Sequence, residues 1–275
     1  MNALSFKLFT WLFLAALALA NQNLDKNLDT QRVDCYPEAP YSFGQPIETQ
    51  CRQRNCLFQS STVANVPWCF FPQESFGYTM LNYTNIKNGH VIYLRRLTKY
   101  SSPFPDPIDN LRLDVEYLNS KTLHFKIYDS SQTRYEVPIE LNDVRDSDSF
   151  TPELTFTFEN RAADSVFTFK VVRKSTGLAL FDTSIGSFVF SDQFLQIATI
   201  LPAGSNLYGF GENNHASVSH DMNNRLWGMW ARDEPNVAGE NLNQYGVQPV
   251  YNVIEADGNA HGVAFVNSNA MEYAT

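Results

Sequence analysis

Short runs in which apolar and polar residues alternate dominate the chain after Gly77, and they constrain its fold more than any other feature. At residues 154–158, leucine and phenylalanine alternate with threonine, as expected of a strand with one buried face. Turn residues such as Ser175-Thr176-Gly177 and Asp257-Gly258-Asn259 separate the runs. Many short strands in sequence predict a mainly β protein with a large antiparallel β-sandwich. The runs are residues 90–99, 111–117, 123–128, 154–159, 166–173, 188–190, 194–201, 250–256 and 261–267.

The size and charge of the chain limit its partners. With 275 residues, of which 44% are hydrophobic, the sequence can form one large or two ordinary domains with packed cores. The net charge is −9 and no basic block occurs, which argues against nucleic acid and anionic membrane surfaces as partners. No phosphate loop, dinucleotide fingerprint or nucleophile elbow is present, so we expect no cofactor. The oligomeric state is left open.

The N-terminus has the pattern of a secretory signal peptide. Lys7 precedes an apolar run at residues 8–20 that ends in Ala18-Leu19-Ala20, the small-x-small form that signal peptidase cuts. A membrane anchor is the alternative, but such a run spans only about 20 Å of a ~30 Å hydrocarbon core. We expect residues 1–20 to be removed, no membrane span to remain, and a secreted or lysosomal destination. Residues 21–31 are polar and are expected to form a flexible lead.

All four cysteines follow this segment, at Cys35, Cys51, Cys56 and Cys69. In the secretory pathway such a cluster indicates a small module held by disulfides. A zinc site is the alternative, but the spacings contain no C-x-x-C pair, so we expect no metal.

The sequence around these cysteines closely resembles the trefoil, or P-type, domain, which we expect at residues 32–80. The segments that carry the resemblance are Arg32-Val33-Asp34-Cys35, Cys51 with Cys56, and Val66-Pro67-Trp68-Cys69-Phe70-Phe71-Pro72. The resemblance places the four cysteines at the second, third, fourth and sixth of the family's six positions. It therefore implies the pairs Cys35–Cys56 and Cys51–Cys69.

Two other residues of this module carry expectations. Leu57 stands at the fifth cysteine position of the family, and we expect its side chain to pack where the missing sulfur would lie. Trp68 is expected in the core of the module, with stacking on a sugar as the alternative.

Residues 207–252 combine aromatic residues with glycines, asparagines and an Arg-Asp pair, which is poor helix material. Flat rings beside carboxylates and amides suit a carbohydrate, because the ring takes the sugar's C–H face and the polar groups take its hydroxyls. An aromatic core with a surface loop is the alternative. The aromatic residues are Tyr208, Phe210, Trp227, Trp230, Tyr245 and Tyr251.

A series of motifs in residues 173–271 resembles the N-terminal, galactose-mutarotase-like β-sandwich of glycoside hydrolase family 31, in its α-glucosidase branch. The motifs are Arg173-Lys174-Ser175-Thr176-Gly177 with Leu180-Phe181-Asp182-Thr183, Asp192-Gln193-Phe194-Leu195-Gln196, Leu201-Pro202, Leu207-Tyr208-Gly209-Phe210-Gly211-Glu212, Trp230-Ala231-Arg232-Asp233, Asn241-Leu242-Asn243-Gln244-Tyr245-Gly246, and His261-Gly262-Val263-Ala264-Phe265-Val266-Asn267-Ser268-Asn269-Ala270-Met271. The resemblance implies that the sandwich occupies residues 81–275.

The resemblance also implies an activity, because members of this family hydrolyse α-glucosidic bonds with retention. They use two aspartates in a (β/α)8 barrel that follows the sandwich, and retaining chemistry places two carboxyl groups about 5 Å apart. The family's nucleophile motif, W-I-D-M-N-E, does not occur in these residues. We therefore expect no catalytic residue here, a sandwich that is incomplete at its C-terminal end, and marginal stability of the isolated chain from an unpaired strand at residues 261–267.

In the same family the loop with the Arg-Asp pair reaches over the barrel mouth, and its Asp hydrogen-bonds sugar hydroxyls. The resemblance thus implies that Asp233 contacts the substrate, with Arg232 orienting it and Trp230 beside them. A salt bridge between Arg232 and Asp233 is the alternative. The expected function is that of a carbohydrate-binding, substrate-rim part of a retaining α-glucosidase that acts on α-linked gluco-oligosaccharides. A non-enzymatic, lectin-like secreted trefoil protein is the alternative.

Two further motifs concern glycosylation and metal binding. Asn82-Tyr83-Thr84 is an N-glycosylation acceptor, expected in an exposed linker after the trefoil domain. His215 and His220 could be imagined as metal ligands, but five residues apart they share no face of a helix or strand, so a solvated loop is favoured.

Overall fold

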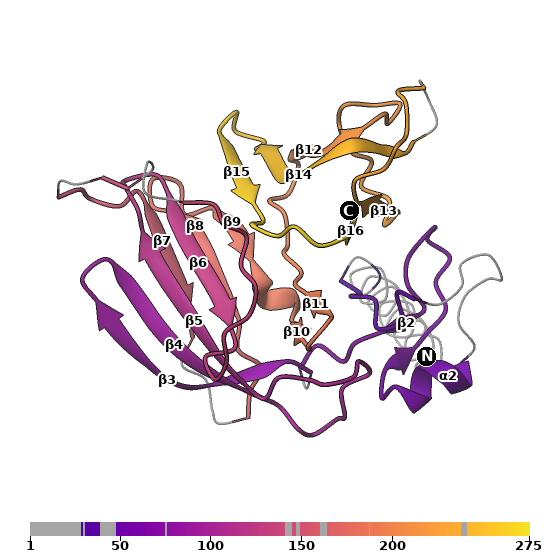
Figure 1. Ribbon diagram of the computed structural model, residues 1–275, viewed down its shortest axis with the longest axis horizontal. Coiled ribbons are helices and arrows are strands. Elements are labelled where there is room, and N and C mark those ends of the chain that lie inside the picture. The colour runs from indigo at the N-terminus through magenta and orange to yellow at the C-terminus, as the bar shows by residue number, and fades with distance from the viewer. Residues whose placement is uncertain are drawn as a thin grey trace, which may run out of the picture. The chain divides into compact units, whose positions relative to one another are not determined.

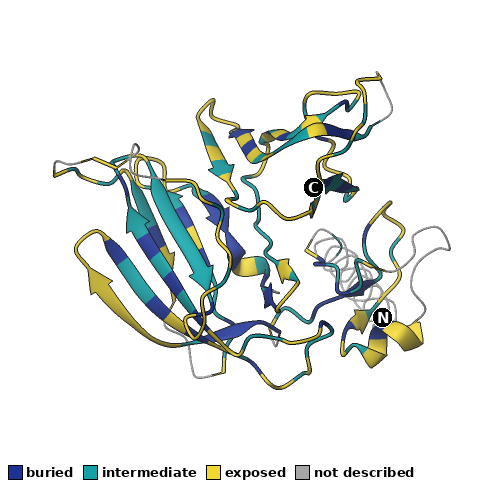
Figure 2. Ribbon diagram, viewed as in Figure 1, coloured by how far each residue is buried: buried dark blue, intermediate teal, exposed yellow. Residues whose placement is uncertain are grey.

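The chain divides in sequence, between Phe71 and Pro72, into two compact units. Figure 1 shows the computed structural model, and Figure 2 shows the burial of its residues. The expected signal peptide and nearly all of the expected lead lie outside the described residues. The structure describes residues 29, 31–38, 48–74, 76–140, 145–146, 149–159, 164–186, 188–237 and 241–275.

The first unit is small and is held by two disulfides. They join Cys35 to Cys56 and Cys51 to Cys69, the pairs that the resemblance implies. Strands β1 (Leu57–Phe58) and β2 (Cys69–Phe70) pair antiparallel. Helix α2 (Glu48–Gln53) carries Cys51, so the second bond ties this helix to the hairpin. The hydrophobic core of so small a unit is correspondingly reinforced by covalent links.

Arg32 fills the interior of this unit with a charged side chain that is 1% exposed. Its guanidinium donates hydrogen bonds to the carbonyl oxygens of Gln59 and Pro67, at 2.7 and 3.3 Å, and it lies 4.5 Å from the centre of the Phe70 ring. Asp29 completes the environment with an ion pair of 2.7 Å. Asp29 falls in the segment expected to be a flexible lead, so the folded module begins before Arg32.

Two expectations for this module need correction. Leu57 does not replace a buried sulfur, because its side chain lies on the outward side of β1 and is 45% exposed. Trp68 is only partly buried and meets Phe58 edge to face, with ring centroids 6.2 Å apart. It therefore lies at the margin of the core rather than inside it.

The second unit begins with two antiparallel sheets packed face to face, which confirms the predicted mainly β fold (Figure 1). Alternate residues of one inner strand, at residues 110–117, point into the core, as shown by Leu111, Leu113 and Val115, which are at most 1% exposed. Phe156, Phe169 and other residues of the second sheet close this core from the opposite side. The first sheet has the order β3 (Tyr78–Ile86), β4 (Gly89–Arg96), β5 (Asn110–Tyr117) and β6 (Leu123–Tyr128), and the second has β7 (Leu154–Phe158), β8 (Phe169–Arg173) and β9 (Ala179–Asp182).

The expected boundary between residues 80 and 81 falls inside β3. The hydroxyl of Tyr78, at the start of this strand, donates to the carbonyl oxygens of Ile108 and Phe190 in the second unit, so the strand cannot belong to the trefoil module. Asn82 is exposed as expected, but it lies on β3 and not in a linker.

A second group of strands follows in the same unit. The three-stranded sheet places β14 (Asn243–Ile254) between β12 (Asn206–Asn213) and β15 (Ala260–Ala264). Strand β13 (Leu226–Met229) pairs with β16 (Met271–Ala274). The core here contains Leu207, Phe210, Met229, Tyr251 and Val253, and partly buried Val263 and Phe265 pack against both this core and that of the sandwich. The short strands β10 (Val189–Phe190) and β11 (Leu195–Gln196) pair between the two groups in sequence.

Gly209 allows β12 and β14 to approach closely. Its φ of +109° is one that residues with a side chain rarely adopt. A Cβ atom there would also meet the backbone of Val250 and lie 2.9 Å from the Cα of Tyr251. A larger residue at this position would therefore force the two strands apart.

Helix is scarce in the described residues. Helix α2 has six residues, and the 3-10 helix η3 (Thr183–Ile185) is a single turn that begins where Asp182 accepts a hydrogen bond from the Ser184 backbone amide. None of the helices that the structure describes is long and apolar enough to cross a lipid bilayer.

Candidate functional site

The candidate site lies in the loop that follows β13. Trp230, the first residue after this strand, has 40% of its surface exposed. Its carbonyl oxygen accepts a hydrogen bond from the Asn243 side chain, and the Arg232 backbone amide donates to the Gln244 carbonyl oxygen at 2.9 Å. Asn243 and Gln244 are both buried at the start of β14. The loop is thus fixed to a strand while its aromatic ring stays open to solvent.

Gly228 determines where the Trp230 ring can lie. The two residues are two apart on an extended chain, so their side chains share one face. A Cβ atom at Gly228 would collide with the Trp230 ring, which shows that the indole folds back over this glycine. The absence of a side chain at residue 228 therefore sets the position of the ring.

Arg232 lies beside the Trp230 ring, but it does not orient Asp233. Its guanidinium carbon is 5.8 Å from the centre of the indole, and Nη2 is 3.8 Å from Oε2 of Glu234. The alternative salt bridge between Arg232 and Asp233 is also absent from the described residues. Asp233 is exposed, and among the residues that the structure describes its carboxylate makes no hydrogen bond or ion pair. That carboxylate is consequently free to accept hydrogen bonds from a ligand.

Five of the six aromatic residues of the 207–252 stretch fall into two sets, and Tyr208 is intermediate in burial. Phe210, Trp227 and Tyr251 are at most 7% exposed and belong to the core, as in the alternative interpretation of this stretch. Trp230 and Tyr245, by contrast, are 40% and 57% exposed. Of these five residues, Trp230 and Tyr245 expose enough surface to offer a ring face to a sugar.

Glu212, the last residue of the Gly-Phe-Gly-Glu motif, lies next to the exposed set. One of its carboxylate oxygens accepts a hydrogen bond of 2.8 Å from the backbone amide of Gly246. Gly246 follows Tyr245 directly in β14. Sequence reasoning did not single out Glu212, Asn243 or Gln244 as residues that support the site. The available signal was their polar character at strand positions where apolar residues are usual.

The rings of His215 and His220 lie close together, with their centroids 5.5 Å apart. The contacts of the two rings do not suit the binding of a metal ion. Nε2 of His220 lies 2.9 Å from the Gly209 carbonyl oxygen, and Nδ1 lies 3.5 Å from the Tyr273 hydroxyl. The His215 ring packs on Trp227 at 3.8 Å. Both histidines therefore have structural roles in the aromatic core.

The environment of His215 disfavours its charged form. Burial lowers the pKa of His215 from 6.5 to about 4, and the neighbouring His220 and Arg225 side chains act in the same direction. Arg225 is itself held above the Trp227 ring, at 4.3 Å. His215 is accordingly neutral at physiological pH.

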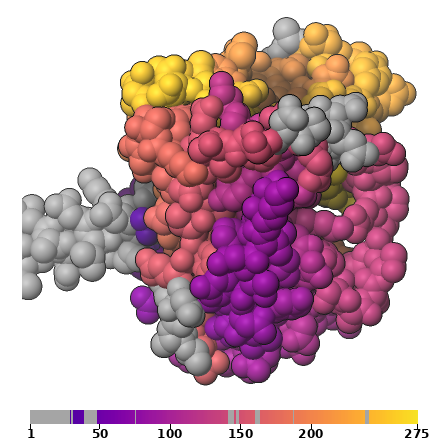
Figure 3. All heavy atoms as spheres, turned by 90° about the vertical axis from the view of Figure 1, so that its left-hand side faces the viewer, coloured from indigo at the N-terminus to yellow at the C-terminus, as the bar shows by residue number. Residues whose placement is uncertain are grey.

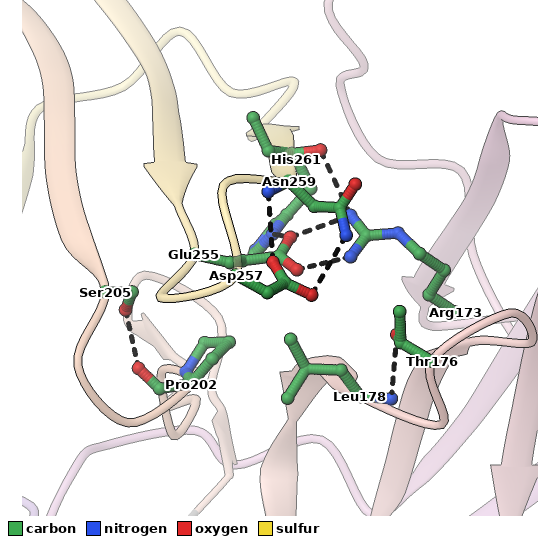
Figure 4. Close-up of polar contacts among 10 residues, drawn as sticks. Arg173, Thr176, Leu178, Pro202, Ser205, Glu255, Asp257, Asn259 and His261 are labelled. Carbon is green, nitrogen blue, oxygen red and sulfur yellow. Dashed lines mark hydrogen bonds and ion pairs between the residues drawn. The ribbon is translucent and has the colours of Figure 1, made fainter.

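A buried charged cluster connects β8 to the β14–β15 hairpin (Figure 4). Arg173 forms a two-pronged ion pair with Glu255, whose side chain is only 1% exposed, and it also donates to the Ala260 carbonyl oxygen at 3.1 Å. Nδ1 of His261 lies 2.9 Å from Oε1 of Glu255. Hydrogen bonding to Arg173 lowers the pKa of Glu255 despite its burial. The cluster thus links the β14–β15 hairpin to the sandwich, and the candidate loop is hydrogen-bonded to the start of β14.

The cysteine sulfurs offer no metal site. Cys35, Cys56 and Cys69 have sulfur atoms within 4.8 Å of one another. All three are bonded in disulfides, so none provides the thiolate that a metal ion requires.

Comparison with known proteins identifies both parts of the chain. Residues 27–72 match the trefoil (P-type) domain family. The chain is 37% identical to intestinal sucrase-isomaltase of Oryctolagus cuniculus in an alignment of 254 positions that covers 89% of the chain. It is 34% identical to probable maltase-glucoamylase 2 of Homo sapiens in an alignment of 255 positions that also covers 89% of the chain. It is 34% identical to lysosomal alpha-glucosidase of Mus musculus in an alignment of 254 positions that covers 88% of the chain.

The chain matches only part of each relative. The matched region is 13% of the rabbit sucrase-isomaltase, 10% of the human maltase-glucoamylase 2 and 24% of the mouse lysosomal enzyme. The similarity agrees with the motifs seen in the sequence. The chain is therefore a trefoil-containing relative of the α-glucosidases of glycoside hydrolase family 31.

Proposed function

We propose that the second unit provides a substrate contact of a retaining α-glucosidase acting on α-linked gluco-oligosaccharides. Trp230 and Asp233 would contact the substrate at the rim of the site where the glucosidic bond is cleaved. The observation that carries the proposal is an exposed indole on a loop anchored by Asn243 and Gln244, with an exposed carboxylate on the same loop that has no intramolecular partner among the described residues.

The chemistry of these groups fits a sugar. The indole face of Trp230 accepts the C–H face of a pyranose, and the Asp233 carboxylate accepts hydrogen bonds from two neighbouring hydroxyls. Arg232 lies beside the indole and is paired with Glu234, so it supports the ring and leaves Asp233 for the ligand. This assignment is one of binding and positioning, and we assign bond cleavage to no residue of this chain.

Titration with maltose and isomaltose tests the contact, with heat and tryptophan fluorescence as readouts. Asp233→Asn should weaken binding by at least about tenfold, because a hydrogen bond to a charged group contributes about 1.5–3 kcal/mol. Trp230→Ala should remove most of the fluorescence change. Asp146→Asn, at another exposed aspartate, serves as the control and should bind like the unchanged chain. If the unchanged chain gives neither heat nor a fluorescence change with either sugar, the contact does not exist.

A hydrolysis assay tests whether this chain only binds. We expect no release of glucose from maltose above the blank by the purified 275-residue chain. Turnover by this chain that disappears in Asp233→Ala would show that the chemistry, and not only the contact, resides here.

The trefoil module supports a second candidate, a non-enzymatic lectin-like function. Trp68 is only partly buried, so part of this residue lies at the surface of the first unit. The two candidate functions differ in which variant should lose sugar binding. Loss of sugar binding in Trp68→Ala, together with unchanged binding in Asp233→Asn, would favour the lectin-like protein.

Two disulfides in the first unit favour the interpretation that the chain folds in the oxidising secretory pathway. We expect a secreted or lysosomal destination. We expect the mature protein to begin at Asn21 after removal of residues 1–20. N-terminal sequencing of material from the medium and from lysosomes of expressing cells measures both the cut and the destination. A product that still begins at Met1 would contradict this assignment.

A further inference from the structure

A row of side chains crosses the outer face of the first sheet of the sandwich. Asn82 on β3 is the direct cross-strand partner of Tyr93 on β4, Tyr93 is the partner of Arg112 on β5, and Arg112 is the partner of Tyr128 on β6. Direct partners in antiparallel strands point to the same face. The neighbours of Tyr93 in sequence, Ile92 and Leu94, are buried in the core, so the face that carries this row is the outer one.

The groups of this row are held in fixed positions. The guanidinium carbon of Arg112 lies 6.0 Å from the Tyr93 ring centre and 5.9 Å from the Tyr128 ring centre. Asp114 joins them, because one of its oxygens accepts from Nε of Arg112 at 2.6 Å and the other from the Tyr128 hydroxyl at 3.0 Å. The surface is therefore an ordered platform of two rings, a guanidinium and a carboxylate.

The platform remains accessible. Tyr93 is 38% exposed, and the side chains of Arg112 and Asp114 are 33% and 34% exposed. In Figure 3 the purple segment that contains β3 and β4 lies at the surface facing the viewer. A ligand can thus reach one tyrosine ring and two charged groups at once.

Strand β3 is the edge of this sheet, and its outer half is poorly covered. Leu81 and Ile86 are 47% and 48% exposed, and Tyr83 is 44% exposed although it touches Phe158. An exposed, apolar edge strand invites pairing with another chain. Asn82-Tyr83-Thr84, the acceptor sequence for N-linked glycosylation, lies in this part of the strand.

We propose that Asn82 carries an N-linked glycan whose first two sugars lie along this row, on Tyr93 and against Arg112 and Asp114. In the attachment, Nδ2 of Asn82 bonds to the anomeric carbon of an oligosaccharide carried on a lipid pyrophosphate. The bond from that carbon to the pyrophosphate oxygen breaks, the amide loses one proton, and the lipid pyrophosphate leaves. The disulfides place the chain in the compartment where such donors occur.

Tethering makes even a weak contact effective. The first N-acetylglucosamine is bound to the residue opposite Tyr93, and neighbouring strands are about 4.8 Å apart, so the ring is within reach without a linker. Its local concentration is then in the millimolar range or above. The Tyr93 ring packs on the sugar's C–H face, and Arg112 and Asp114 hydrogen-bond the acetamido and hydroxyl groups of the second sugar. The glycan also shields the exposed edge of β3.

The test uses the full chain from a host that adds N-glycans. Peptide mapping by mass spectrometry should find a glycan on Asn82, and none in Thr84→Ala, which keeps the asparagine. The decisive readout is the rate at which peptide-N-glycosidase releases the glycan from the native protein. Tyr93→Ala should be deglycosylated about fivefold faster than the unchanged chain, because loss of one ring contact exposes the linkage.

Matched variants separate the platform from general effects. Tyr93→Phe keeps the ring and should retain slow release, while Tyr135→Ala removes a tyrosine that is 74% exposed elsewhere and should leave the rate unchanged. Arg112→Gln gives a second perturbation should Tyr93→Ala fail to fold, and it too should accelerate release. After denaturation all variants should be cleaved at one rate. An unmodified Asn82, or native release that is equally fast in the unchanged chain and in folded Tyr93→Ala or Arg112→Gln, overturns the proposal.

Discussion

At the scale of single residues, Glu255 organises more of its surroundings than any acidic residue of the candidate loop. Its carboxylate is buried, yet it remains charged because Arg173 and His261 hydrogen-bond it (Figure 4). Hydrogen bonding to Arg173 lowers the pKa of Glu255, and pairing with Glu255 raises the pKa of Arg173. The charge of Glu255 thus helps to fix the position of the β14–β15 hairpin relative to β8.

Glu255→Gln should destabilise the protein strongly. Removing one partner leaves the Arg173 charge facing a neutral group in a largely buried place, which costs about 3 kcal/mol or more. Urea unfolding followed by circular dichroism measures the loss. Glu116→Gln is the matched control, because Glu116 pairs with Arg145 at the surface and its loss should cost less than about 1 kcal/mol. Equal stabilities of the two variants would contradict a structural role for the cluster.

His215 should make stability depend on pH. Its pKa is about 4 in the folded protein and 6.5 when unperturbed, so between these values the unfolded chain binds more protons than the folded one. The contribution of neutral His215 is fully present above about pH 6.5 and is lost as the pH falls towards 4. His215→Gln should therefore reduce the slope of unfolding free energy against pH in this window. An unchanged slope, measured by urea titrations at several pH values, would refute this assignment.

At the scale of elements, the end of β13 is shaped by the smallest residue in it. Gly228 leaves the space over which the Trp230 indole folds, and Asn243 and Gln244 of β14 hold the backbone that follows. The position of the exposed ring therefore depends on Gly228, which lies two residues earlier on the same chain, and on the Arg232 side chain beside the ring.

Gly228→Ala should displace the Trp230 ring while the protein stays folded. The new methyl group collides with the indole, and the indole can swing outward because it is 40% exposed. We expect weaker maltose binding, by about the factor seen for removal of one aromatic contact, roughly fivefold. Fluorescence titration measures the affinity. Gly204→Ala alters a glycine with φ of +72° on another turn, and it should lower stability without changing sugar affinity.

Elements with clear alternation could be predicted closely from the sequence. Residues 123–128 form β6 as expected, and residues 154–159 exceed β7 by one residue. Strand β14 begins at Asn243, seven residues before the expected run, because its first residues are buried through hydrogen bonds and not through apolar side chains. Strands β12 and β13 were not predicted at all, since glycine at Gly209, Gly211 and Gly228 interrupts the apolar pattern.

The motif indicated which loop to consider, but it did not give the contacts within that loop. The family resemblance implied that Arg232 orients Asp233, with a salt bridge between the two as the alternative. On an extended chain, side chains two residues apart share a side, so Arg232 meets Glu234 instead. The same rule gives the relation of Gly228 to Trp230, and it would have predicted both from the sequence once the strand was recognised.

At the scale of the whole molecule, the chain consists of units stabilised by different means. All four cysteines lie in the first unit, where the two disulfides span 21 and 18 residues of sequence. The second unit contains no cysteine and relies on two apolar cores and the Glu255 cluster. The two units should therefore respond differently to reduction.

Replacement of Cys51 and Cys69 together by serine should destabilise the trefoil unit alone. Closing a loop of this size contributes about 3 kcal/mol in the chain-entropy model. Hydrogen exchange followed by mass spectrometry should show faster exchange in peptides from residues 48–71, with peptides from β4 to β8 unchanged. Cys35 and Cys56 stay oxidised in this variant and report on the remaining link. Simultaneous loss of protection in both units would show that they fold as one.

Val263 and Phe265 pack against both apolar cores of the second unit. A side chain shared by two cores cannot leave one of them without loosening the other. Backbone amides of Val171 in the sandwich and Val253 in the neighbouring sheet should then become solvent-labelled in one event, with a common free energy of opening. The loop that holds Trp230, which is hydrogen-bonded to β14, would consequently be rigid for as long as the sandwich itself survives.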